Sequence, residues 1–373
     1  MKRLAVIGVV MLALLWGTGA VPGEIDREHV YTRVNLVSDI AGVARFTDPN
    51  LVNPWGLAFS PTSPFWVADN GSGVSTLYNG RGQAFPVAAP LVVTIPSPTN
   101  PTGGGTPTGL VFNGTGEFVV AANGKSGSPP FLFATEDGTI LGWSPTVNGT
   151  QAIIAVDHSG AGAVYKGLAI ASTPTGHFLY ATNFHDGVVE IYDKNFTLMT
   201  TFTDAQVDAN FAPFGIQNID GKLYVTFALQ QLPDKHDDQA GPGNGFVDVF
   251  DTDGTLLRQF AAHGPLNSPW GLALAPAEFG QFSQHLLVGN FGDGRINAFD
   301  VDSGEFDSPL IDPEGNPLTI NGLWALQFGN GAPNGGSGHT LFFTAGIADE
   351  AHGLFGFIRA GRFMRAGHEE DAH

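Results

Sequence analysis

One short segment recurs through the chain and limits its fold more than any other feature. It is an apolar strand introduced by a Pro or aromatic residue and a Gly, as in NPWGLAF from Asn53 and SPWGLAL from Ser268. The six copies carry glycines spaced 48 to 58 residues apart, at Gly56, Gly109, Gly167, Gly215, Gly271 and Gly322. A period of this length, with several strands per unit, is typical of the blades of a β-propeller.

Each unit continues with further strands. The second strands are expected to end at Asn70, Asn123, Asn183, Phe227, Asn290 and Gly346. Third strands such as FVDVF alternate in character, and Asp-Gly turns lead into a fourth strand. The 51 Gly and 25 Pro residues argue against long helices, because both residues interrupt them.

The ends of the repeat predict how the ring closes. The sixth unit lacks an outer strand, and YTRVNLVSD from Tyr31 resembles the outer strand LLRQFAAHG of the fourth unit. We therefore expect an all-β, six-bladed β-propeller over residues 31–358, with the ring closed by an N-terminal strand that completes the last blade. Residues 359–373 are expected to form a flexible C-terminal tail.

The first twenty residues predict export. Lys2 and Arg3 precede an apolar run from Leu4 to Trp16 and then small residues, which is the pattern of a cleavable signal peptide over residues 1–20. We expect a periplasmic or extracellular protein, with no membrane span after signal removal. The chain has no Cys, so its core must hold without disulfides. We expect a monomer.

Charge and motifs exclude several functions. With 35 acidic and 16 basic residues the net charge is −19, which disfavours binding to nucleic acid. No G-x-S-x-G elbow occurs, and a chain without Cys has neither a thiol nucleophile nor a c-type haem site. The fragment NGKS from Asn123 is not a P-loop, because Val119 stands where the upstream Gly is needed. We expect neither haem nor nucleotide as a cofactor.

Several longer segments resemble a known family. NPWGLA, WVADN, EDGTILGW, VYKGLA, GPGNGFVDVFD and LLVGNFGDGRINAFD are similar to an exported bacterial propeller family, some of whose members carry a C-terminal PEP-type sorting segment. The repeat unit is also similar, more loosely, to the NHL repeat and to six-bladed calcium-dependent lactonases and phosphotriesterases. The resemblance spans nearly all of the mature chain; it implies the fold directly and an activity only by analogy.

Blade geometry indicates where a ligand would bind. The start of the first strand and the end of the second converge on one rim of the central channel, so this rim and its loops supply the candidate ligand-binding residues. These are Trp55, Tyr165, Phe214, Trp270, Lys125 and Asp238. Trp55 and Trp270 are suited to stack on a sugar or another planar ligand, although a plug of the core below the rim explains them equally well.

The rim also suggests a metal site. Four second strands are expected to end in asparagine, and the candidate cation ligands are Asn70, Asn123, Asn183, Asn290 and Glu350. Oxygen ligands of this kind suit Ca²⁺. The alternative is that each Asn only ends its strand and caps a turn, which Gly71 and Gly124 favour by following two of them.

The loops beyond the rim carry candidate catalytic groups. These are His185, His236, Asp237, Glu350 and His352, which could act as acid and base or bind a transition metal. The insertion QQLPDKHDDQAGPGNG is the longest interruption between a second and a third strand. A long charged loop over a rigid ring often carries function, but a solvated acidic loop is an equally good interpretation.

Two functions follow from these observations. The favoured one is a binding or scaffold protein with a ligand or cation site on the channel rim, its partner being a small molecule, a glycan or a protein. The alternative is a metal-dependent, calcium-type hydrolase or lactonase at the mouth of the channel, in which the cation polarises a carbonyl or phosphoryl oxygen. Because the expected strand ends supply no carboxylate, binding is preferred, and the sequence leaves open whether the protein is an enzyme.

Overall fold

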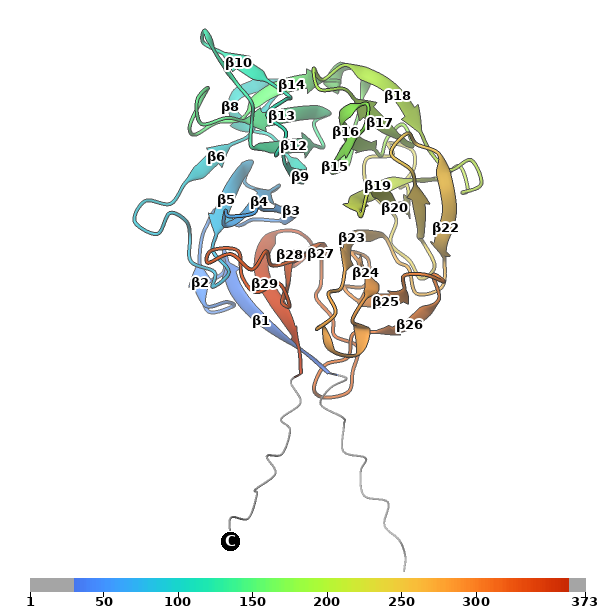
Figure 1. Cartoon of the computed structure of the whole chain (residues 1–373). Coiled ribbons are helices and arrows are strands. Elements are labelled where there is room, and N and C mark those ends of the chain that lie inside the picture. The colour runs from blue at the N-terminus through green and yellow to red at the C-terminus, as the bar shows by residue number, and fades with distance from the viewer. Residues whose placement is uncertain (1–29, 362–373) are drawn as a thin grey trace, which may run out of the picture.

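The computed structural model describes residues 30–361, which form a ring of six β-sheets around a central channel (Figure 1). This confirms the six-bladed β-propeller. The expected signal peptide, and residues 362–373 of the expected tail, lie outside the described residues. Within residues 30–361, no helix is long and apolar enough to cross a membrane.

Blades 1 to 3 each contain four antiparallel strands. Blade 1 consists of β3 (Pro54–Ala58), β4 (Phe65–Asp69), β5 (Val74–Tyr78) and β6 (Val92–Thr94). Blade 2 consists of β9 (Pro107–Phe112), β12 (Phe131–Thr135), β13 (Thr139–Trp143) and β14 (Ile153–Asp157). Blade 3 consists of β15 (Tyr165–Thr173), β16 (Gly176–Asn183), β17 (Val188–Tyr192) and β18 (Leu198–Phe202).

Blades 4 to 6 complete the ring. Blade 4 consists of β19 (Phe211–Ile219), β20 (Lys222–Leu229), β21 (Phe246–Phe250) and β22 (Leu256–Ala262). Blade 5 consists of β23 (Pro269–Leu274), β24 (His285–Asn290), β25 (Ile296–Asp300) and β26 (Phe306–Pro309). Blade 6 consists of β27 (Leu323–Phe328), β28 (Leu341–Ile347), β29 (His352–Ala360) and β1 (Tyr31–Ser38), with β2 (Phe46–Thr47) beside β1.

The ring closes through the first and last strands, as the sequence predicts. β1 pairs antiparallel with β29 in a register that runs from Tyr31 opposite Ala360 to Ser38 opposite Leu354. The two strands lie side by side in Figure 1, where blue meets red. Because blade 6 is built from both ends of the chain, no sheet edge faces the gap between the first and last repeats.

Two hairpins interrupt the repeat: β7 (Pro96–Ser97) with β8 (Asn100–Gly104), and β10 (Val120–Ala122) with β11 (Lys125–Gly127). The second hairpin corrects the expected strand order of blade 2. The segment that ends at Asn123 is not its second strand; it belongs to this hairpin, which lies beside the outer strand β14. The second strand is β12, so the end of that strand is Thr135, followed by Glu136.

The sixth repeat is also shifted from its expected register. In blade 1 the ladder pairs Pro54 with Asp69 and resumes at Leu57 with Val67. In blade 6 it pairs Leu323 with Ala345 and resumes at Leu326 with Phe343. Trp324 therefore corresponds to Trp55, and Ala325 rather than Gly322 takes the position of the repeated glycine.

Adjacent blades are joined near the centre of the ring by buried threonines. The Thr182 hydroxyl accepts a hydrogen bond from Gly167 N in its own blade at 2.6 Å and donates to Phe214 O of the next blade at 2.8 Å. The repeated glycines allow this close approach. A Cβ atom added at Gly215, for example, would lie 2.1 Å from Trp270 O of the following blade.

Candidate functional site

One end of the channel is closed by aromatic side chains. Trp55, Trp270 and Trp324 come from the first strands of blades 1, 5 and 6, and each is at least nine-tenths buried. Trp55 stacks on Trp324 at 3.4 Å, and Trp270 meets both rings edge-on. Phe214 of blade 4 packs against the same group. The packing therefore supports the view that Trp55 and Trp270 plug the core. Their rings are packed against other aromatic side chains and cannot stack on a sugar without rearrangement.

A lysine lies directly against this plug. Lys166 follows Tyr165 in β15, and its side chain is 2% exposed. Its Nζ lies 5.0 Å from the centre of the Trp55 ring and 5.8 Å from that of Phe184, close enough for cation–π attraction. A buried ammonium needs charged or polar partners, because desolvation is otherwise very costly. Lys166 finds them in the loops above.

Glu136 is the first of these partners. It contacts Lys166 Nζ in a short ion pair, and its other oxygen accepts a hydrogen bond from Asn70 Nδ2 at 2.8 Å. The β12–β13 turn holds it there, since Asp137 accepts a bond from Thr106 N at 2.8 Å. Gly138 completes the turn at φ +78°, where a Cβ would lie 2.6 Å from Ala163 O. The local sequence EDG therefore fixes the backbone of the turn that carries Glu136, and Lys166 and Asn70 hold its side chain.

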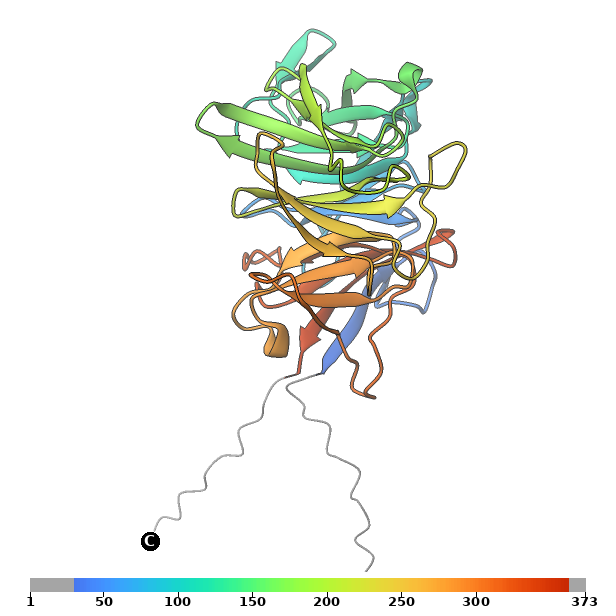
Figure 2. The same cartoon turned by 90° about the vertical axis from the view of Figure 1, so that its right-hand side faces the viewer.

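The loop after β20 supplies the next two groups. Figure 2 shows this loop, in yellow, projecting beyond the ring on the side where β20 ends. A bridge between Gln230 and Asp238 closes its base. Asp237 lies 3.7 Å from Lys166 Nζ and 2.9 Å from His236 Nδ1. This hydrogen bond raises the pKa of His236 and lowers that of Asp237, so the pair favours the charged forms of both.

Glu350 approaches from blade 6. Asn53 Nδ2 donates to its carboxylate at 2.7 Å, and Asn53 Oδ1 accepts from Trp324 Nε1 at 3.1 Å. Glu350 ends a run of three residues with positive φ, after Ala348 and Asp349. We call the opening formed by Asn53, Asn70, Glu136, Lys166, His236, Asp237, Asp238 and Glu350 the channel mouth.

Two carboxyl groups of the channel mouth, Asp238 and Glu350, are buried without a full set of partners for their negative charge. Burial raises the pKa of Asp238 and that of Glu350. The neighbouring Ser268 hydroxyl for Asp238 and the Asn53 amide for Glu350 act against this increase, and the positive charge of Lys166 adds to their effect in both cases. The Oδ2 atom of Asp238 is buried and has no hydrogen-bond partner among residues 30–361. Four carboxyl groups therefore share two positive charges, Lys166 and protonated His236, which leaves the channel mouth with an excess of negative charge when all four are ionised.

A cavity of about 420 Å³ opens beside the channel mouth, between blades 5 and 6. Phe291, Asp293, Asp349 and Glu350 line it, and several glycines expose backbone to it. The ring of Phe291 stacks on Trp324 at 4.1 Å, which links the cavity to the aromatic plug. None of the described residues that line this cavity is basic.

The expected ring of asparagines does not form. Of the four asparagines expected at strand ends, only Asn70 lies in the channel mouth. Asn183 and Asn290 are one ladder position earlier and so face the other way: Asn183 Nδ2 donates to Glu190 and Asp186, and Asn290 Nδ2 donates to Pro265 O and Asp293. Asn123 is in the β10–β11 hairpin at φ +52°. For Asn123, Asn183 and Asn290 the structure therefore agrees with the alternative explanation, in which an Asn at the end of a strand caps a turn and binds no cation.

The other predicted residues are divided between the channel mouth and the rest of the molecule. His236, Asp237, Asp238 and Glu350 come together. Tyr165 instead points into blade 3, where its hydroxyl bonds Glu190 at 2.7 Å. Lys125 is exposed on the β10–β11 hairpin. His185 pairs with Asp186, and His352 pairs with Asp39 at 2.6 Å where β1 ends, so neither contacts Lys166.

Sequence reasoning missed Asn53, Glu136, Lys166 and Trp324. A signal existed for Lys166, because it directly precedes the repeated glycine, in the position held by Trp55, Phe214 and Trp270 in other units. Glu136 was not identified because the second strand of blade 2 was expected to end at Asn123 and not at Thr135. Trp324 was hidden by the shifted register of the last repeat.

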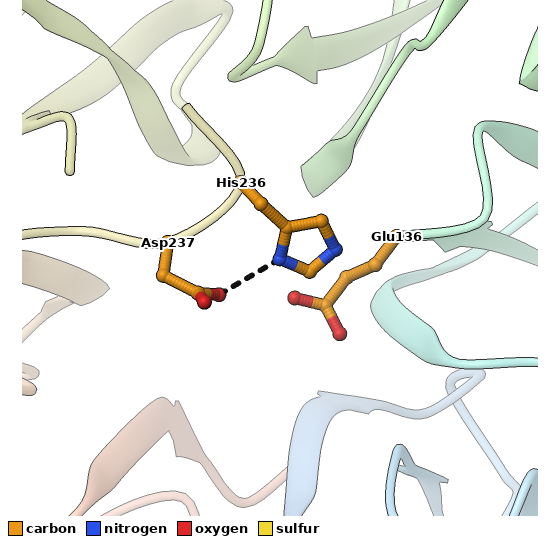
Figure 3. A group of neighbouring side chains, drawn as sticks. All are labelled: Glu136, His236 and Asp237. Atoms are coloured by element: carbon orange, nitrogen blue, oxygen red, sulfur yellow. Dashed lines mark hydrogen bonds and ion pairs between the residues drawn. The ribbon is translucent and has the colours of Figure 1, made fainter. Parts of the chain in front are cut away.

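Glu136, His236 and Asp237 form a group that can be tested as a metal site. One ligand atom from each lies within 4.8 Å of the others, and Figure 3 shows the His236 imidazole between the two carboxyl groups. Two carboxylates and one imidazole suit a transition metal better than Ca²⁺, which prefers six to eight oxygens. The Lys166 ammonium, however, contacts two of the three ligands. As arranged, these residues do not fit a resident metal.

Comparison with known proteins identifies relatives from a virus. Two proteins of Acanthamoeba polyphaga mimivirus are similar over 87% of the chain: Uncharacterized protein R648 at 32% identity, and Uncharacterized protein L690 at 31% identity. The matches cover 78% and 84% of those proteins. No protein-family model matches the chain. Because these relatives are viral, the bacterial origin implied by the resemblance is not supported.

Solved structures share the fold. A streptogramin B lyase matches with a TM-score of 0.52 at 13% identity, over 88% of this chain and 97% of that one. The soluble aldose sugar dehydrogenase of Escherichia coli matches with a TM-score of 0.52 at 13% identity, over 89% and 100%. The WD40 domain of Neurospora crassa Pan2 matches with a TM-score of 0.50 at 10% identity, over 90% and 97%. At such identities the likeness shows the propeller fold alone.

Proposed function

Since the chain belongs to the family of the mimivirus proteins R648 and L690, whose names state no activity, we propose its function from its own channel mouth: it is an exported protein that binds a cationic ligand there. The observation that carries this proposal is the imbalance of charge at the channel mouth. Lys166 pairs with Glu136 and Asp237, and His236 also pairs with Asp237, whereas Asp238 and Glu350 form no ion pair within residues 30–361. A bound cation would stabilise both carboxylates in their charged forms.

The adjoining cavity supports a ligand larger than a bare ion. Its volume of about 420 Å³ is in the range of small-molecule sites. Asp293, Asp349 and Glu350 favour a positive group, and the ring of Phe291 adds an apolar and cation–π surface. We therefore favour a protonated amine attached to a small apolar or aromatic body. Export is part of this proposal and depends on the signal-like pattern of residues 1–20.

Calorimetric titration with benzylamine tests the proposal, with benzyl alcohol as the neutral ligand of similar shape. We expect benzylamine to bind and benzyl alcohol to bind at least tenfold more weakly. Glu350→Gln keeps the shape of the side chain and removes its charge, so it should weaken benzylamine binding at least tenfold. Circular dichroism on the same samples verifies that the variant is folded.

A matched control separates the channel mouth from the general acidity of the protein. Glu314→Gln removes one carboxylate from an exposed loop position near Tyr31, outside the cavity, and should leave benzylamine binding unchanged. Equal losses in Glu350→Gln and Glu314→Gln would mean that the amine senses only net charge. Equal binding of amine and alcohol would contradict a cationic ligand.

The alternative, a calcium-type hydrolase or lactonase, has one supporting observation: Glu136, His236 and Asp237 converge. The ion pair of Lys166 with Glu136 opposes it, because an ammonium and a divalent cation repel each other at this distance. Assays with a lactone and a phosphoester, with and without chelator, distinguish the two functions. Hydrolysis that chelation abolishes would favour the enzyme over the binding protein.

A further inference from the structure

Lys166 has the position and the contacts of a bound cation. Its ammonium group lies among carboxylates from blade 2 and from the loop of blade 4, and below it are the faces of Trp55 and Phe184. The carboxylates among these groups are the ligands that a divalent metal at the channel mouth would also use. From this geometry we propose that Lys166 is a tethered cation that replaces a divalent metal and keeps Glu136, His236 and Asp237 as a closed metal site.

Three candidate metal ligands already converge around this ammonium group. The ligand atoms of Glu136, His236 and Asp237 lie within 4.8 Å of one another, and they come from two loops that the rigid ring holds opposite each other (Figure 3). His236 Nδ1 now hydrogen-bonds Asp237, so a metal held by both residues would take the place of this hydrogen bond on Nδ1. Imidazole with two carboxylates suits Mn²⁺ or Zn²⁺. Asp238 follows Asp237 directly in the chain, and its Oδ2 is buried without a hydrogen-bond partner within residues 30–361.

Burial explains why one positive charge must be present here. Removing the ammonium leaves the partly buried Glu136 carboxylate without its ion-pair partner, and an unpaired charge in such a place is strongly destabilising. A divalent ion can restore the balance only if the ammonium is absent, since two cations that contact the same carboxylate repel each other. Lys166 and the metal are therefore mutually exclusive occupants.

The test compares Lys166→Met with Lys166→Arg in the whole chain. Lys166→Met keeps an unbranched apolar side chain and removes the charge, whereas Lys166→Arg keeps the charge. We expect Lys166→Met to bind one Mn²⁺ or Zn²⁺ per chain at least tenfold more tightly than the wild type, as measured by calorimetry. We expect Lys166→Arg to behave like the wild type. Adding His236→Ala to Lys166→Met should abolish the gain.

Folding is the second readout. If Lys166→Met unfolds without metal, Mn²⁺ should restore its folding and raise its melting temperature, but should not rescue Lys166→Met/His236→Ala. Equal metal affinity in the wild type and Lys166→Met would overturn the proposal, as would a folded Lys166→Met that binds neither metal. The inference does not depend on the amine ligand, because benzylamine can fail to bind the wild type while Lys166→Met gains a metal.

Discussion

Glu350 illustrates how burial tunes a single carboxyl group at the channel mouth. Burial raises its pKa above the ordinary 4.5, although Asn53 donates a hydrogen bond to it and so acts in the opposite direction. The neutral form, which persists at higher pH than usual, has little attraction for a cation. Binding of a cationic ligand must therefore compete with the proton.

This competition gives a prediction with a definite sign. The affinity for benzylamine should increase as the pH rises from 4.5 through the raised pKa of Glu350, and it should then level off. Binding within that range should release protons, because the bound amine stabilises the carboxylate. Calorimetry in two buffers of different ionisation enthalpy measures the released protons. Glu350→Gln should release fewer protons, and an affinity independent of pH would argue against the amine site.

Asp248 of blade 4 gives a second prediction for one residue. It is fully buried, and neither of its carboxyl oxygens has a hydrogen-bond partner in the described part of the chain. Burial and the nearby Asp204 raise its pKa to about 8. Between pH 4 and pH 8 the folded protein therefore retains a proton that the unfolded chain has lost, so the free energy of unfolding should fall as the pH rises.

The variant Asp248→Asn removes this titration. Between pH 5 and pH 8 the free energy of unfolding should fall less in this variant than in the wild type. The difference between the two falls should be on the order of 3 kcal/mol. Urea unfolding at the two pH values measures it. Asp302→Asn, which changes an exposed carboxylate, should retain the pH dependence of the wild type. The same pH dependence in both variants would mean that Asp248 does not titrate in this range.

A one-residue difference in strand register explains why the sequence alone could not show which asparagines belong to the site. Asn70 and Asn183 both follow apolar strands of similar composition, yet Asn183 pairs with Tyr165 in the ladder, whereas Asn70 lies one residue beyond its ladder. A shift of one residue turns a side chain to the opposite face. Register is set by contacts across strands, which the local pattern of the sequence does not record.

At the level of strands, the repeat predicted the blades but not an insertion inside one of them. The segment FVVAA from Phe118 has the same apolar character as FLFAT from Phe131, so the sequence pattern predicts the first of the two as the second strand of blade 2. In the structure the first segment leads into the short β10–β11 hairpin, and the second forms β12. The error moved the end of the strand from Thr135 to Asn123, and Glu136 was missed for this reason.

The threonines that join neighbouring blades predict a stability effect. The Thr344 hydroxyl accepts from Ala325 N at 3.0 Å and donates to Trp55 O at 2.5 Å, so it connects blade 6 with blade 1. Thr344→Val keeps the shape and leaves both buried backbone groups without this partner. We expect a loss of about 3 kcal/mol in the free energy of unfolding, since each unsatisfied group costs about 1–3 kcal/mol.

The control for this prediction lies on an outer strand. Thr201 is exposed on β18, and Thr201→Val should change the free energy of unfolding by no more than about 0.5 kcal/mol. Chemical denaturation of both variants makes the comparison. Similar small effects in Thr344→Val and Thr201→Val would mean that the buried hydroxyl is not needed to join the blades.

The molecule as a whole is a ring, and the two ends of the described chain meet within blade 6. The outer strand β1 comes from the N-terminal end of the described chain and the other three strands from its C-terminal end. Every other blade is continuous in sequence. Separating β1 from β29 would expose two sheet edges and the apolar cluster around Tyr31, Phe279 and Phe282.

A disulfide across this closure should therefore stabilise the entire ring. Thr32 and Arg359 are exposed and directly opposite each other in the β1–β29 ladder, and the chain has no other cysteine with which a new pair could react. Cross-strand partners of this kind have Cα separations that a disulfide can span. The bridge links positions far apart in the sequence, so we expect about 2–4 kcal/mol of added stability in Thr32→Cys/Arg359→Cys.

The comparison is made within this one variant, because the loss of Arg359 also removes its contact with the ring of Phe357. The oxidised form should melt at a higher temperature than the same protein under reducing agent, and unfolding should stay a single transition. Oxidised and reduced forms with equal melting temperatures would indicate that the ring opens between other blades first. The buried threonine hydroxyls between blades, rather than the closing strand, would then limit the stability of the propeller.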